Sequence, residues 1–270
     1  MSAGDSPQYA IEVEDLVTHY GTKKILDGVD LKVVEGEIII IMGGSGSGKS
    51  ALLRHMLGLH QPTKGRIRLL GQDIAELSES EMHDMRKSMG VAFQGGALFS
   101  SMTVGENVQL PLREHTKLDS KTMEIMARMK LEVVNLGGFE DLMPAQLSGG
   151  MIKRVALARA IVMDPKLLFF DEPSARLDPV VAAELDELIL QLREAMNMTI
   201  VVVTHELESA FKIADRITVL DEGKMLMTGT VEEVKGSDHK RVQDLLNRRP
   251  SREEIDADAY LHRLTGESPA

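Results

Sequence analysis

The chain has 270 residues, and 42 acidic side chains against 31 basic ones give it a net charge of −11. An acidic chain with only three tyrosines, six phenylalanines and no tryptophan is a poor candidate for nucleic-acid binding, so we expect no nucleic-acid partner. The absence of cysteine excludes disulfides, thiolate metal sites and a cysteine nucleophile. Hydrophobic residues make up 43% of the chain without an apolar run of about 18, and the first ten residues lack a signal pattern, so we expect neither a transmembrane helix nor a secretory signal.

Short hydrophobic strands alternate with helical patterns along the chain, which is typical of an α/β protein with a mainly parallel sheet. Ala10–Leu16 and Ile25–Val34 alternate apolar and polar residues, which predicts two strands with one buried face each. Ile38–Met42 is continuously apolar, which predicts a strand buried on both faces. Two later segments share this character: Leu167–Phe170 and Ile200–Val203.

The stretch from residue 96 to residue 163 differs from these strand-rich parts. It has few β-branched runs and strong helical periodicity, for example across Ser120–Leu136. We interpret residues 96–163 as a helical subdomain inserted into a larger domain of residues 1–240. Further along, Ile217–Leu220 and Lys224–Met227 flank an Asp-Glu-Gly turn, which predicts a hairpin.

The composition changes again near residue 240. We interpret residues 241–270 as a C-terminal extension, in which the spacing of Leu261 and Leu264 favours a short amphipathic helix. An apolar face outside a complete domain needs a surface that covers it, so we expect this tail to pack against a partner subunit.

A glycine-rich motif follows the predicted strand Ile38–Met42 and precedes a helical pattern, Ala51–Leu59. It fits the pattern G-x-x-x-x-G-K-[ST] and consists of Gly43, Gly44, Ser45, Gly46, Ser47, Gly48, Lys49 and Ser50. The strand–loop–helix context favours a phosphate-binding loop over a chance glycine-rich turn. Backbone N–H groups and the helix N-terminus would hold phosphates, Lys49 would reach the β- and γ-phosphates, and Ser50 would ligate Mg²⁺.

Two carboxylates, Asp171 and Glu172, directly follow the strand Leu167–Phe170. A carboxylate at the end of a buried strand is costly unless a cation or hydrogen bonds compensate it. Taken alone, the pair could also be solvated acids at an ordinary strand end. Because the chain also has a phosphate loop, we expect Asp171 to ligate Mg²⁺ and Glu172 to activate water.

A second anion cradle is predicted at Ser148, Gly149 and Gly150, which precede the helical pattern Ile152–Met163. Ser148 is a natural N-cap and two glycines at a helix start expose N–H groups, although an ordinary capped helix would look the same. A single nucleotide does not need two cradles from one chain, so we expect a site shared between two copies. Gln94 and His205 each follow a strand-like segment and indicate no function when taken singly.

In their order and spacing these motifs resemble those of the ATP-binding subunits of ABC transporters, over about Ala10–Lys235. The resemblance implies an α/β P-loop NTPase fold of the ABC type, with an N-terminal antiparallel β-subdomain and an inserted helical subdomain. It also implies an ATPase with ATP and Mg²⁺ as cofactors. The resemblance implies that Tyr20 stacks on adenine and that the backbone around Ala51 contacts phosphate. It implies that Glu172 is the general base and that His205 contacts the γ-phosphate. It also implies that Gln94 senses Mg²⁺ and the membrane partner, and that Asp178 lies in the loop that crosses the dimer interface.

Three further segments resemble the ATPase of Mla/MCE-type phospholipid transporters: Phe93–Phe99, Pro111–Thr116 and the signature motif Leu147–Met151. This resemblance implies transport of phospholipid between the inner and outer membranes of bacteria. The implied assembly is a homodimer with composite ATP sites, integral membrane permease subunits and an MCE-type lipid-binding protein. The ATPase would then be peripheral, at the cytoplasmic side of the inner membrane.

Alternatives to this function are the ATPase of another ABC transporter, a non-transport ABC ATPase and a nucleotide-regulated binding module. Non-transport ATPases of this fold typically carry two cassettes or a long coiled coil, whereas this chain has one phosphate loop and no heptad run. The presence of Glu172 disfavours a binding module without turnover.

Three positions depart from the wider ABC pattern. Met151 stands where glutamine is usual and cannot donate a hydrogen bond. Arg176 stands where glycine is common, so a positive φ there would strain the loop. Ala51 replaces a common threonine and lacks its hydroxyl.

Overall fold

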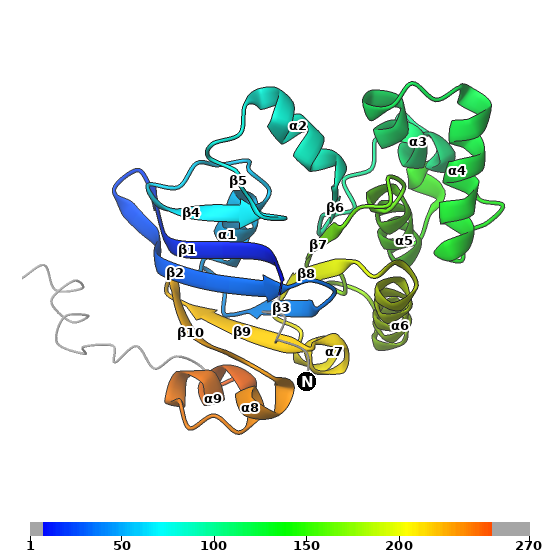
Figure 1. The fold of residues 1–270 in the computed structure, drawn as a ribbon. Coiled ribbons are helices and arrows are strands. Elements are labelled where there is room, and N and C mark those ends of the chain that lie inside the picture. Colours follow the sequence, from blue (N-terminus) through cyan, green and yellow to red (C-terminus); the bar gives the residue numbers. More distant parts are fainter. Residues whose placement is uncertain (1–7, 250–270) are drawn as a thin grey trace, which may run out of the picture.

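A computed structural model describes residues 8–249, which form two sheets with helices around them (Figure 1). The larger sheet has six strands in the order β10-β9-β3-β8-β7-β6. Five of them are parallel and β10 pairs antiparallel with β9, so both the predicted parallel sheet and the predicted hairpin are confirmed. The strands are β3 (Ile38–Met42), β6 (Met89–Ala92), β7 (Leu167–Asp171), β8 (Thr199–Thr204), β9 (Arg216–Asp221) and β10 (Lys224–Gly229).

The smaller sheet is antiparallel, with the order β2-β1-β4-β5. Its strands are β1 (Tyr9–Tyr20), β2 (Lys23–Val34), β4 (Lys64–Leu69) and β5 (Gln72–Asp73). The first two were predicted from their alternating pattern, and both extend further than that pattern indicates. Only Ile67 and Leu69 of β4 are buried, while Arg66 pairs outward with Glu14 at 2.9 Å. We did not predict β4, because two buried positions are too few for a clear alternation of apolar and polar residues.

Helices α3, α4 and α5 stand together at one side of the molecule, beyond β6 and β7 (Figure 1). No strand lies between residues 96 and 163, so this stretch is helical as expected. The helices are α1 (Lys49–Met56), α2 (Glu79–Lys87), α3 (Val104–His115), α4 (Ser120–Val133), α5 (Gly149–Ala160), α6 (Pro179–Met196), α7 (Leu207–Ile213), α8 (Val231–Lys235) and α9 (Lys240–Leu246), with a 3₁₀ turn at Pro144–Gln146. The predicted tail helix around Leu261 and Leu264 lies outside the described residues.

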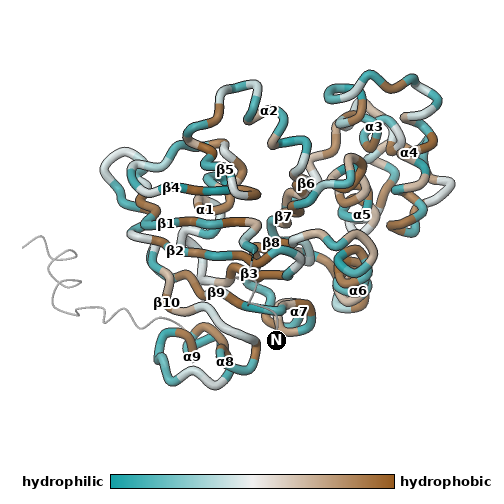
Figure 2. Tube along the Cα trace, in the orientation of Figure 1, coloured by the Kyte–Doolittle hydropathy of each residue, from teal (hydrophilic) through white to brown (hydrophobic). Residues whose placement is uncertain are grey.

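Strand β3 lies between two hydrophobic cores. Its side chains alternate, so Ile38, Ile40 and Met42 pack into the core that the helices α3 to α6 share. Ile39 and Ile41 point to the other face and pack with residues of β1, β2 and α1. Figure 2 shows hydrophobic residues gathered along β3 and its neighbours β8 and β9. β3 therefore contributes to both cores, as its sheet neighbours β7 and β8 also do.

The methionines of α4 divide between core and surface. Met123 and Met126 pack against the helical core, whereas Met129 is 61% exposed.

Within residues 8–249, every helix is too short or too polar to traverse a bilayer.

Arg176 lies in the loop before α6 and has a φ of 65°, in the left-handed region. This conformation costs a non-glycine residue about 1–2 kcal/mol. The strain expected from the sequence is thus present in the backbone. Since the side chain is exposed, no core packing offsets the strain.

Replacing Arg176 with glycine should leave the protein equally stable or up to about 1 kcal/mol more stable, because relief of the strain outweighs the entropy that glycine loses on folding. ATPase activity should be equal or higher. Thermal unfolding and steady-state turnover test both. The matched control is Ala175→Gly, at a neighbour without a positive φ, and this variant should be less stable. A large fall in the turnover of Arg176→Gly would mean that the arginine makes a needed contact.

Candidate nucleotide site

The glycine-rich motif forms the connection between β3 and α1, at the carboxyl end of the parallel sheet. A Cβ at Gly43 would lie 2.1 Å from the main-chain oxygen of Leu220, so only glycine fits where the loop crosses β9. Gly48 caps α1 with a φ of 107°, and no side chain accepts a hydrogen bond there. The first N–H groups of α1 therefore have no side-chain cap, which leaves them available to a phosphate.

The ammonium of Lys49 is folded back over this loop. Its Nζ donates to the main-chain oxygens of Gly43 at 2.8 Å and of Gly44 at 2.9 Å. Burial lowers the pKa of Lys49, and the nearby charges of Glu172 and Asp171 oppose that shift. The neighbouring Ser50 is exposed, while the side chain of Ala51 is buried in the core. The loop therefore holds a positive charge at its centre and a free hydroxyl at its rim.

Asp171 ends strand β7 close to several cations. Burial raises the pKa of Asp171, as does the charge of Glu172, whereas Arg54, Lys153 and Lys49 lower it. Among the described residues, no group of three His, Cys, Asp or Glu side chains could hold a metal ion. The predicted set of Ser50, Gln94 and Asp171 has only one carboxylate. Such oxygen donors suit Mg²⁺, which usually keeps phosphate oxygens and water as its other ligands.

Glu172 and His205 lie side by side, although 33 residues separate them. The Oε1 atom of Glu172 is 2.8 Å from Nδ1 of His205, and its Oε2 atom accepts a hydrogen bond from Thr204 Oγ1 at 3.1 Å. The side chain of Glu172 is 12% exposed, against 59% for His205. The parallel pairing of β7 with β8 brings the two residues together, because it places the ends of both strands at one edge.

The two other motif residues lie at helix starts. Ser148 caps α5 by accepting a hydrogen bond from Met151 N at 3.3 Å, and Asp178 caps α6 through the N–H groups of Val180 and Val181 at 3.1 Å. Whereas α5 packs against α3, α4, α6 and β6, α1 packs against β2, β4 and β8. Within one copy, the two predicted cradles thus belong to different parts of the fold.

Gln94 and Tyr20 lie at the ends of strands. Gln94 follows β6 and is exposed, and its main-chain oxygen accepts a hydrogen bond from Lys153 Nζ. Tyr20 ends β1 and is half-exposed, with its ring edge-on to His60 at a centroid distance of 6.1 Å. The open face of Tyr20 is available for stacking.

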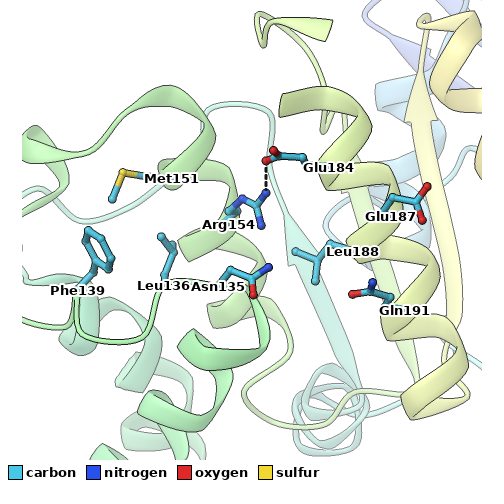
Figure 3. A pocket seen from close by; sticks show the side chains of 9 residues that line it. All are labelled: Asn135, Leu136, Phe139, Met151, Arg154, Glu184, Glu187, Leu188 and Gln191. Carbon is cyan, nitrogen blue, oxygen red and sulfur yellow. Dashed lines mark hydrogen bonds and ion pairs between the residues drawn. The ribbon is translucent and has the colours of Figure 1, made fainter. Parts of the chain in front are cut away.

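A groove of about 540 Å³ lies beside α5, the helix that begins within the signature motif, and between the α4–α5 connection and α6 (Figure 3). In this view the side chain of Met151 is directed toward Phe139, and Arg154 pairs with Glu184 at 2.8 Å. Met151 therefore lines this groove together with Leu136 and Phe139.

Sequence reasoning missed two polar residues at the site, Thr204 and Lys153. Thr204 could have been found, since it ends the strand that precedes His205. Lys153 offered no signal, because a lone lysine on a helical pattern usually lies on a solvated surface. Only the fold brings it to the main chain of Glu172, at 3.0 Å.

Comparison with known proteins assigns the family. Residues 26–175 match the family model described as ABC transporter. The chain is 43% identical over 239 residues to the intermembrane phospholipid transport system ATP-binding protein MlaF of Haemophilus influenzae, covering 88% of this chain and 90% of the relative. It is 40% identical over 240 residues to the "probable ribonucleotide transport ATP-binding protein mkl" of Mycobacterium leprae, covering 89% and 69%.

Solved structures agree with this assignment. A dimeric ATP-binding cassette in a post-hydrolysis state with ADP and Pi superposes with a TM-score of 0.75 at 30% identity, over 82% of this chain and 98% of that one. The cbiO1 protein of Clostridium perfringens superposes with a TM-score of 0.78 at 29% identity, over 95% and 99%. The predicted ABC-type fold and ATPase activity are confirmed. The chain belongs to the ABC transporter family, as an ATP-binding protein that hydrolyses ATP.

Proposed function

We propose that this ATPase drives phospholipid transport between the inner and outer membranes of bacteria. The supporting observation is the 43% identity to an intermembrane phospholipid transport ATPase over nearly the full length of both chains. The segments Phe93–Phe99 and Pro111–Thr116 add to it. The proposed assembly is a homodimer bound to permease subunits and an MCE-type lipid-binding protein, at the cytoplasmic side of the inner membrane.

A second candidate is the ATPase of a transporter with another substrate. It is favoured by the nearly equal identity, 40%, to a relative named for ribonucleotide transport. A non-transport ATPase is disfavoured, because these relatives are all named for transport.

The site residues are proposed to divide the work of hydrolysis. The loop Gly43–Ser50 binds the phosphates, with Lys49 as its cation, and Tyr20 stacks on adenine. Glu172 accepts a proton from the attacking water, a role that its small exposed fraction and its carboxylate contacts with Thr204 and His205 support. Ser50, Gln94 and Asp171 would hold Mg²⁺, which when bound neutralises phosphate charge.

Two copies are proposed to share each nucleotide. The phosphate loop of one copy would face Ser148–Gly150 and Asp178 of the other. This arrangement is supported by the separation of α1 and α5 within one copy and by the dimeric form of similar cassettes. Each nucleotide would then favour the dimer by mass action. Its hydrolysis would loosen the dimer, and a permease near Gln94 would respond to that movement.

Glu172→Gln should keep ATP affinity and lose most turnover, about 10²–10⁴-fold, because a carboxamide cannot accept the proton. ATP-bound dimer should accumulate. Nucleotide binding, steady-state ATPase assays and size-exclusion chromatography with ATP measure these three effects. Turnover near that of the unaltered protein would exclude Glu172 as the base.

Lys49→Ala and Ser148→Arg should each abolish hydrolysis, the first through the phosphate loop and the second by blocking closure. Mixing the two variants tests the shared site. In a mixed dimer one site carries both defects and the other carries neither, so partial activity should return. If mixed dimers form and remain inactive, independent composite sites are ruled out.

The transported substrate can be tested on the complex that co-purifies from membranes with the tagged chain. The complex should contain a permease and a lipid-binding subunit, and in proteoliposomes its ATPase activity should move fluorescent phospholipid. Glu172→Gln serves as the inactive control. Stimulation of ATPase activity by ribonucleotides other than ATP, without movement of phospholipid, would favour the second candidate instead.

A further inference from the structure

Helix α5 begins at the signature motif, and one of its side chains, Lys153, contacts the loop after β7 in which Glu172 lies. Its Nζ donates to the main-chain oxygen of Glu172 at 3.0 Å and also to the main-chain oxygen of Gln94. These two acceptors belong to different loops, one after β7 and one after β6. Lys153 thus joins three segments: the helix that carries Ser148, the loop of Gln94 and the proposed base.

The main chain of Glu172 needs such an anchor. Its φ is 50°, a left-handed conformation that non-glycine residues avoid and that persists only where the surroundings impose it. Glu172 N donates to Val203 O at 2.8 Å, which fixes one side of the residue to β8. The carbonyl on the other side is held from α5 by the ammonium of Lys153.

The electrostatic setting of Lys153 agrees with a fixed position. Burial lowers the pKa of Lys153, and Arg176 lowers it further, while Asp171 and Glu172 raise it. A partly buried ammonium is costly unless acceptors compensate it, and here two main-chain carbonyls accept its hydrogen bonds while the charges of Asp171 and Glu172 favour its charged form. A lysine that served only solubility would instead extend into solvent.

A second cation of α5 shows what is particular to Lys153. Arg159 donates to the main-chain oxygens of Gly96 and Ala97, both at 2.7 Å, and so also holds the segment after Gln94. Neither of these two hydrogen bonds reaches Glu172. Helix α5 therefore hydrogen-bonds to the segment after β6 through both Lys153 and Arg159, and to Glu172 through Lys153.

We propose that Lys153 is a positioning residue for hydrolysis, which holds the left-handed main chain of Glu172 and so aims its carboxylate. Because Lys153 lies on α5, this alignment depends on the place of the signature helix. A helix displaced from the core would release the Glu172 carbonyl and lower turnover. The inference rests on the proposed role of Glu172 as the base.

The test compares Lys153→Met, which keeps the length of the side chain and removes its donors, with Lys153→Arg, which retains donors. In the assembled complex, Lys153→Met should lower kcat about 10–100-fold with the KM for ATP and the affinity for a fluorescent ATP analogue nearly unchanged. Lys153→Arg should recover most of kcat. The matched control is Lys130→Met on α4, whose lysine pairs with Asp164 at the surface and whose loss should not affect kcat.

Three results would overturn the proposal: an unchanged kcat in Lys153→Met, a loss of nucleotide affinity equal to the loss of kcat, or equal inactivity of the methionine and arginine variants. If Lys153→Met does not fold, Lys153→Leu, which is shorter and also has no donor, is judged by the same criteria. The Glu172→Gln variant is measured in parallel. Activity in that variant would reject the proposed base, whereas an inactive Glu172→Gln with a fully active Lys153→Met would reject the positioning role alone.

Discussion

The parallel pairing of β3 with β8 and β9 is the constraint on which the rest of the structure depends. It buries both faces of β3, which requires the continuous apolar run Ile38–Met42. Together with the parallel pairing of β7 with β8, it places the ends of β3, β7 and β8 at one edge, where the glycine loop, Asp171 and His205 lie. Residues far apart in the chain become neighbours because their strands run in the same direction.

Much of this arrangement can be predicted from the sequence, because the relevant signals are local. The buried strands appear as apolar runs, and the glycine loop follows one of them. We did not predict α2, although Ser78 and Glu81, which form a capping box at its start, are a local signal of this kind. Even the strain at Arg176 could be anticipated from a residue type that is unusual at its position.

Other features have no local signal. Strand β4 has only two buried residues, and α3 continues through Pro111, which a helix pattern would treat as a stop. The contacts of Lys153 join three segments that are distant in sequence, so no window of residues could reveal them. Contacts of this kind depend on tertiary packing, which no local pattern in the sequence reveals.

The way in which α1 begins has a thermodynamic consequence. Helices α2 to α6 each have a side chain that caps their first turn, whereas α1 begins at Gly48 without one, as the short helices α7 and α9 also begin without one. A capping side chain at this position would occupy the N–H groups that a phosphate needs. If the loop binds phosphate as proposed, the ligand would complete this helix terminus, and by linkage the local stability of α1 would rise and fall with nucleotide occupancy.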